Sequence, residues 1–137
     1  MFKILRIDHI VLRARDVGRL VAFYHDVLGC PLEKIQEEFG LWQLRAGDGL
    51  IDIVDIEGKI GRKGGAAPGK EARNLDHFCL RIEPWDEDAL IEHLRQHGIE
   101  PEKAERRYGA DGYGLSIYIE DPEGNVVELK GPRENPF

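Results

Sequence analysis

The sequence predicts an α+β fold made of two βαβββ modules, which form one curved, barrel-like mixed sheet with helices on its outside. A short repeat, a helical pattern after each copy and strand-like segments after each helix support this prediction. Residues 8–13 read Asp-His-Ile-Val-Leu-Arg and residues 76–81 read Asp-His-Phe-Cys-Leu-Arg, which are identical at four of six positions. Internal similarity of this kind indicates that one structural unit occurs twice.

Each copy of the repeat begins a strand and is followed by a predicted helix. The first helix begins at Asp16, a favourable N-cap residue, and its apolar residues recur with helical spacing up to Leu28. Gly29 suits the position just after a helix end. The second helix is predicted to begin near Asp86 and to end at Gly98.

Three strand-like segments follow each helix. They span residues 32–38, 41–46 and 49–56 in the first half and 102–107, 114–120 and 125–130 in the second. Residues 57–74 contain six glycines or prolines, which predicts a flexible connector or lid. We therefore expect a single domain over 1–137, with module one at about 4–56 and module two at about 75–131. Two unrelated α+β halves are the alternative.

The composition excludes several classes of function. A formal net charge of -7 disfavours nucleic acid as a partner, because phosphates would be repelled. The sequence contains no apolar run long enough to span a membrane and no start resembling a signal peptide. The two cysteines do not form a CxxC pair, so neither a disulfide scaffold nor a structural zinc site is indicated. We expect a cytoplasmic protein that acts on a small molecule.

His9 and His77 occupy equivalent positions in the repeat. Side chains alternate along a strand, so each histidine shares a strand face with the arginine four residues later, Arg13 or Arg81. A single histidine on an apolar strand is more often a core residue than a ligand. Two at equivalent positions predict a pair of imidazole ligands for a metal ion.

The last strand of each module carries one acid among apolar residues, Asp52 in the first and Glu128 in the second. Ionised groups are rarely buried unless they are paired or bound to metal. Two histidines and one or two carboxylates, with open positions for water or substrate, form a plausible catalytic metal site. In the alternative, Glu128 pairs with Arg13 or Arg81 and binds no metal.

Four segments together resemble the vicinal oxygen chelate superfamily, which includes glyoxalase I, methylmalonyl-CoA epimerase, fosfomycin-resistance proteins, extradiol dioxygenases and bleomycin-binding proteins. The segments are residues 8–12, 23–29, 75–78 and 121–129. The resemblance implies that His9, His77 and Glu128 bind a divalent metal. Asp52 stands where these enzymes carry glutamate or glutamine, and its shorter side chain makes its direct ligation doubtful. Nickel, zinc, manganese, iron and cobalt all suit this ligand set.

The resemblance also implies a type of chemistry. The metal would chelate neighbouring oxygens of a small substrate and stabilise an enediolate-like intermediate, as in a lyase or isomerase. Glu128 is the first candidate for the proton-transferring base and Asp52 the second. A metal-dependent dioxygenase or thiol transferase and a non-catalytic drug-binding protein remain alternatives. Relatives commonly form homodimers, and the sequence leaves open whether its two halves pair within one chain or across two.

Four further residues are candidates for substrate contact. Arg13 and Arg81 could hold an anionic group of the substrate, or they could form salt bridges at the rim of the site. Trp42 and Tyr113 lie on strands that we expect to line or flank the cup, where packing is the alternative role.

Overall fold

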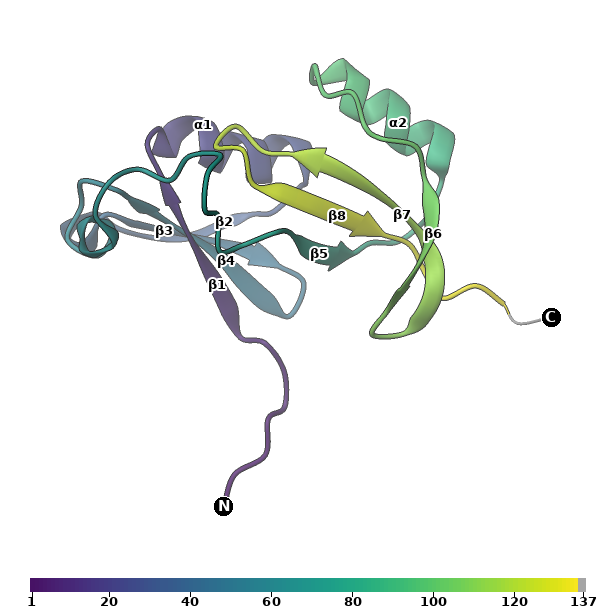
Figure 1. The fold of residues 1–137 in the computed structure, drawn as a ribbon, viewed down its shortest axis with the longest axis horizontal. Coiled ribbons are helices and arrows are strands. Elements are labelled where there is room, and N and C mark those ends of the chain that lie inside the picture. The colour runs from purple at the N-terminus through teal and green to yellow at the C-terminus, as the bar shows by residue number, and fades with distance from the viewer. Residues whose placement is uncertain (136–137) are drawn as a thin grey trace. The chain divides into compact units, whose positions relative to one another are not determined.

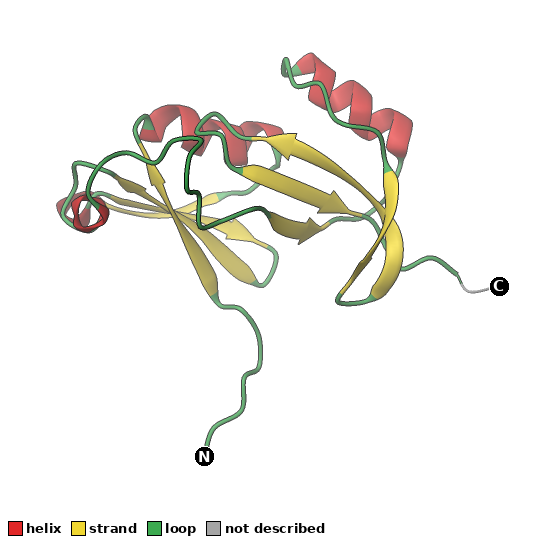
Figure 2. Cartoon of the chain, in the orientation of Figure 1, coloured by secondary structure: helices red, strands yellow, loops and turns green. Residues whose placement is uncertain are grey.

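The computed structural model describes residues 1–135, which form two compact units, one from Met1 to Glu71 and one from Ala72 onward. Each unit holds one four-stranded sheet of mixed strand direction and its own helix (Figures 1 and 2). The boundary between the units falls inside the glycine-rich connector. None of the helices within residues 1–135 is long and apolar enough to cross a membrane.

The first unit carries a sheet of strand order β1-β4-β3-β2. Its elements are β1 (His9–Ala14), α1 (Val17–Ala22), the π-helix η1 (Phe23–Val27), β2 (Leu32–Gln36), the 3₁₀ turn η2 (Glu37–Phe39), β3 (Leu41–Ala46), β4 (Gly49–Asp55) and the 3₁₀ turn η3 (Gly61–Gly64). Strand β1 runs parallel to β4, and the remaining pairs are antiparallel.

The second unit repeats this topology, with strand order β5-β8-β7-β6. Its elements are β5 (Phe78–Arg81), α2 (Glu87–Gln96), β6 (Glu105–Gly109), β7 (Gly112–Glu120) and β8 (Val126–Lys130). Strand β5 runs parallel to β8, as β1 does to β4, and the other pairs are antiparallel. The prediction of two βαβββ modules is confirmed, and each module forms a hydrogen-bonded sheet of its own.

The helix boundaries follow the predicted capping residues. The carboxylates of Asp16 and Asp86 each accept a hydrogen bond from the backbone N–H three residues later, at 3.1 Å. Gly29 adopts a φ of 71° and Gly98 a φ of 76°, a left-handed conformation that glycine adopts without steric cost. The first helix is less regular than predicted, because its second half is a π-helix.

The core of each unit lies between the helix and one face of the sheet. In the first unit Leu20 and Tyr24 from the helical segment are fully buried with Ile53 of β4. In the second unit Leu94 of α2 is buried with Ile117 of β7. Since side chains alternate along a strand, the residues between these core positions point to the opposite face of each sheet. That opposite face carries the candidate site residues.

Strand β1 begins inside the repeat, as predicted, at His9, which pairs with Leu50 near the start of β4. Strand β4 begins at Gly49 after a turn, so residues 1–7 have no neighbouring strand in this unit. Their large apolar side chains are exposed.

Candidate functional site

A histidine and a carboxylate face each other in the second unit. The Nε2 atom of His77 lies 3.2 Å from an oxygen of Glu128, which is only 6% exposed in the middle of β8. The other ring nitrogen, Nδ1, lies 2.7 Å from the carboxylate of Asp76. A carboxylate on Nδ1 favours the tautomer whose Nε2 lone pair is free to bind a metal.

The first unit contains the equivalent pair. The Nε2 atom of His9 lies 3.9 Å from an oxygen of Asp52, and Asp8 holds Nδ1 at 2.7 Å. Asp52 is 3% exposed, and the side-chain amide of Gln43 donates to both of its oxygens at 3.3 Å. The wider gap follows the shorter side chain of aspartate.

The pKa values of both members of the first pair are raised, each by a different main cause. Desolvation raises the pKa of Asp52, although the amide of Gln43 and the charge of His9 oppose the shift. The hydrogen bond that His9 donates to the carboxylate of Asp8 is the main cause that raises the pKa of His9. For Asp52, burial therefore outweighs the stabilisation of its ionised form by Gln43 and His9.

Two more side chains surround Glu128. Partial desolvation of the thiol, together with the negative charge of Glu128, raises the pKa of Cys79 to about 11, although the residue as a whole is exposed. Burial and the same carboxylate also raise the pKa of Tyr118, whose ring packs edge-on against His77 with centroids 5.2 Å apart. Both groups therefore remain protonated at neutral pH and are suited to donate hydrogen bonds to a charged Glu128.

These residues suit a divalent metal by their donor chemistry. Each unit supplies one imidazole nitrogen directed at one buried carboxylate, and the second nitrogen of each ring is held by an exposed acid. No group of three or more histidine, cysteine, aspartate or glutamate side chains arranged to hold a metal is found within residues 1–135. Each pair is therefore half of the ligand set that the sequence predicts.

Arg13, for which the sequence offered substrate contact or a salt bridge at the rim, donates hydrogen bonds to the glycine-rich connector. Its guanidinium donates to the carbonyl oxygens of Gly61 at 2.9 Å, Gly65 at 2.5 Å and Ala66 at 3.2 Å, and to a fourth at Gly64. These hydrogen bonds hold this part of the connector, which the sequence predicts to be a flexible lid, against β1. The physical reason is that a glycine-rich turn leaves several carbonyls without partners, and one guanidinium has enough donors to satisfy them.

Arg81 lies at the edge of the second site and its ion pair is with Asp111, at 3.5 Å. Within residues 1–135 neither Arg81 nor Arg13 forms an ion pair with Glu128. The alternative in which Glu128 serves only as an arginine partner is therefore not what the structure shows.

The two aromatic candidates lie away from the carboxylates. Trp42 pairs with Ile53 across β3 and β4, so it shares the core face of the sheet, opposite to Asp52. Tyr113 packs edge-on against Tyr108 with ring centroids 5.0 Å apart, under the guanidinium of Arg106. Both residues therefore have the packing role that the sequence left open, and for Trp42 strand register, which alternation along one strand does not fix, is the reason.

Sequence reasoning missed two polar residues beside the acids. Gln43 lies directly opposite Asp52 in the β3–β4 ladder, and Lys130 follows Glu128 by two residues on the same face of β8. Lys130, Glu128 and His77 all line one cavity of about 290 Å³. The Glu-x-Lys spacing was a readable signal, because residues two apart on a strand share a face.

Comparison with known proteins places the chain in a family. Residues 6–129 match the Glyoxalase/Bleomycin resistance protein/Dioxygenase superfamily. The chain belongs to this superfamily. The match covers both modules and therefore includes His9, His77 and Glu128.

Individual relatives differ in function. The chain is 29% identical over 130 residues to virulence protein STM3117 of Salmonella typhimurium, covering 90% of this chain and 82% of that protein. The crystal structure of STM3117 aligns with a TM-score of 0.76 at 27% identity, over 96% of this chain and 99% of that one. Glutathione transferase FosA of Serratia marcescens is 26% identical over 123 residues, which cover 90% of this chain and 78% of FosA.

Proposed function

We propose that the protein is a divalent-metal-dependent enzyme that binds a small substrate through two neighbouring oxygens and moves a proton on it, as a lyase or isomerase does. The observation that carries this proposal is the repeated pair: in each unit a histidine Nε2 points at a buried carboxylate while an acid holds Nδ1. His9, His77 and Glu128 are the proposed ligands, and Asp52 is a possible fourth.

Each side chain has a distinct part in this proposal. A bound divalent metal would act as a Lewis acid toward the substrate oxygens. Glu128 is the proposed base, since its buried carboxylate can take a proton at short range. Tyr118 and Cys79 remain protonated beside it and can stabilise its negative charge by hydrogen bonding.

Glutathione transfer is a second candidate, because FosA is similar over 90% of this chain. It uses the same proposed metal ligands and differs in the second substrate. A screen that includes glutathione hemithioacetals, acyl-CoA thioesters, catechols and a glutathione-plus-epoxide assay separates these reactions.

Metal binding tests the common part of both candidates. Calorimetric titration of the metal-free protein with zinc should give one site, and His77→Ala and Glu128→Gln should each weaken it at least tenfold. His25→Ala is the matched control, because His25 also contacts a neighbouring acid, Asp26, at 2.7 Å but lies on η1 without a second carboxylate partner. A wild-type protein without a zinc site, or an equal effect of His25→Ala, would contradict the proposal.

A further inference from the structure

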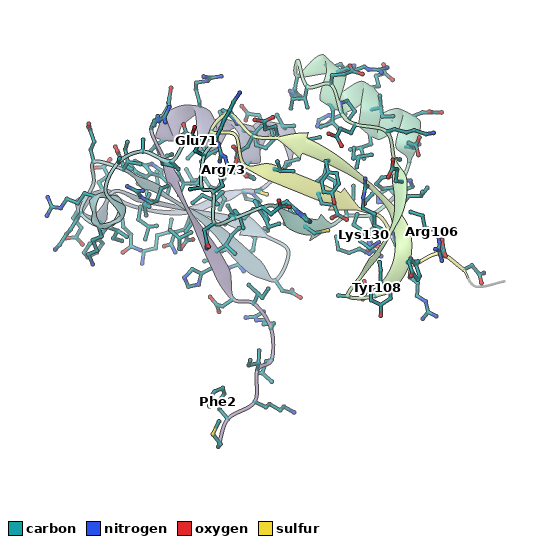
Figure 3. The ribbon with its side chains drawn as sticks, viewed as in Figure 1. Phe2, Glu71, Arg73, Arg106, Tyr108 and Lys130 are labelled. Carbon is teal, nitrogen blue, oxygen red and sulfur yellow. The ribbon has the colours of Figure 1, made fainter. Side chains whose placement is uncertain are left out.

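The cavity beside Glu128 contains two cationic side chains that the proposed proton transfer does not use. Lys130 and Arg81 line this space of about 290 Å³ together with His77 and Glu128. All of these residues belong to the second unit. Figure 3 shows Lys130 at the end of β8, near the β6–β7 hairpin that carries Tyr108.

The register of the second sheet arranges the polar residues in two rows. Glu128 pairs with Cys79 on one side and Tyr118 on the other, and this is the row next to His77. Lys130 pairs with Arg81 and with Ser116, which form the second row. Two residues along a strand span about 6.5–7 Å. The row that contains Glu128 and the row that contains Lys130 are therefore separated by a distance that a small molecule can span.

The ammonium of Lys130 is buried, and the carboxylate of Glu134 interacts with it only through space. The residue is 5% exposed, and its Nζ donates to the backbone carbonyls of Arg107 and Gly114. No ion pair of Lys130 is present among residues 1–135. Burying a charge without a direct ion pair is costly. An ammonium has three hydrogens, so one donor remains for a ligand after these two hydrogen bonds.

The backbone leaves room for this side chain to reach the cavity. A Cβ on Gly109 would lie 2.7 Å from Cε of Lys130, so the absence of a side chain at Gly109 allows the lysine stem to pass. If Lys130 served only in packing, methionine would fill the same space without the desolvation penalty of a buried charge, because its side chain has a similar length and is uncharged.

We propose that Lys130, with Arg81 at the rim, is an anion-binding subsite of this cavity. The substrate is then a small acid whose two neighbouring oxygens would bind the metal that His77 and Glu128 help to hold, and whose carboxylate binds at Lys130. This inference rests on the proposed metal-dependent function and adds the substrate class to it. Arg81 is partly neutralised by Asp111, so Lys130 supplies most of the discrimination.

Two matched probes test the subsite. 2-Oxoglutarate and 2-oxopentanoate share the same neighbouring oxygens, but only the first carries a distal carboxylate. Calorimetry with zinc-loaded wild-type protein should show about 10- to 100-fold tighter binding of 2-oxoglutarate, as expected for a charge-assisted hydrogen bond. In Lys130→Met this ratio should fall to near one, while Lys130→Arg should keep most of it and circular dichroism should show both variants folded.

The two hypotheses fail in different ways. A ratio near one in the wild-type protein, or an unchanged ratio in Lys130→Met, overturns the subsite. If Lys130→Met does not fold, Arg81→Met and Lys130→Arg decide the question, because the subsite predicts a reduced ratio in the first and a retained one in the second. Absence of zinc binding contradicts the proposed metal-dependent function. In that case the two probes are titrated into zinc-free protein, and the ratio of their affinities in the wild type and in Lys130→Met still tests the subsite.

Discussion

At the scale of single residues, burial determines which polar groups matter. Glu128 and Lys130 are both nearly inaccessible to solvent, two residues apart on one strand. Either charge alone would be unfavourable in that position, and each has neighbours that can hydrogen-bond it. Burying these two charges costs folding free energy that apolar side chains at the same positions would not cost. Residues of this kind are expected at a binding site.

The alkylation rate of the Cys79 thiol reports the negative charge on Glu128, because that charge raises the pKa of the thiol. A pKa raised to about 11 leaves roughly 100-fold less thiolate at neutral pH than an ordinary cysteine has. Alkylation of the metal-free protein by iodoacetamide at pH 8 should therefore be slow and should accelerate about tenfold per pH unit up to about pH 11.

Glu128→Gln isolates the electrostatic part of this effect. Removing the carboxylate lowers the pKa of Cys79, so the variant should react faster at pH 8. Cys79→Ser is the control for labelling at Cys30, the buried second cysteine. Equal rates in the wild type and in Glu128→Gln would mean that the carboxylate does not act on this thiol.

At the scale of elements, the first strand and the connector depend on each other. Arg13 extends from β1 and holds residues 61–66 through four backbone carbonyls, and Arg15 donates to the carbonyl of Pro68 at 2.9 Å. A Cβ on Gly64 would lie 2.5 Å from the guanidinium carbon of Arg13, so this contact requires glycine there.

We expect Arg13→Met to release this part of the connector. Loss of these hydrogen bonds should lower the free energy of unfolding by about 1–2 kcal/mol and speed trypsin cleavage at Arg62 and Lys63. Arg6→Met is the matched control, because Arg6 donates to a single carbonyl, that of Asp48 at 3.0 Å. Cleavage at the wild-type rate in Arg13→Met would show that the connector is held by other contacts.

At the scale of the whole molecule, the exposed N-terminal segment supports the expectation of a homodimer. The side chains of Phe2, Ile4, Leu5 and Ile7 are each at least 75% exposed. Figure 3 marks Phe2 in the extended segment that precedes β1. Contiguous exposed apolar residues of this kind are typical of surfaces that bind another protein.

Substitution of these residues tests self-association. If a second copy covers them, Phe2→Ser combined with Ile4→Ser should weaken the dimer at least tenfold, because each buried side chain contributes about 1.5–3 kcal/mol. Light scattering after size-exclusion chromatography gives the mass directly, and Lys3→Ser serves as the control. A wild-type protein that is monomeric at high concentration, or a double variant as dimeric as the wild type, would rule out this role.

The sequence by itself determined the two-module topology and the residue types of the candidate metal site. The repeat, the capping residues and the period-two alternation are local signals, and each reflects the backbone or one strand face. They therefore predict that His9, His77, Asp52 and Glu128 lie on the faces opposite the helices, and the buried apolar neighbours of Asp52 in β4 and of Glu128 in β8 agree with this for the two acids.

Only the tertiary structure decided which side chains lie beside the four candidate metal ligands. Cross-strand register brought Gln43 to Asp52 and Arg81 to Lys130, and it placed Trp42 on the core face. The path of the connector brought the carbonyls to Arg13. Register and loop paths depend on pairings between residues distant in the chain, and a pattern along one strand does not contain that information.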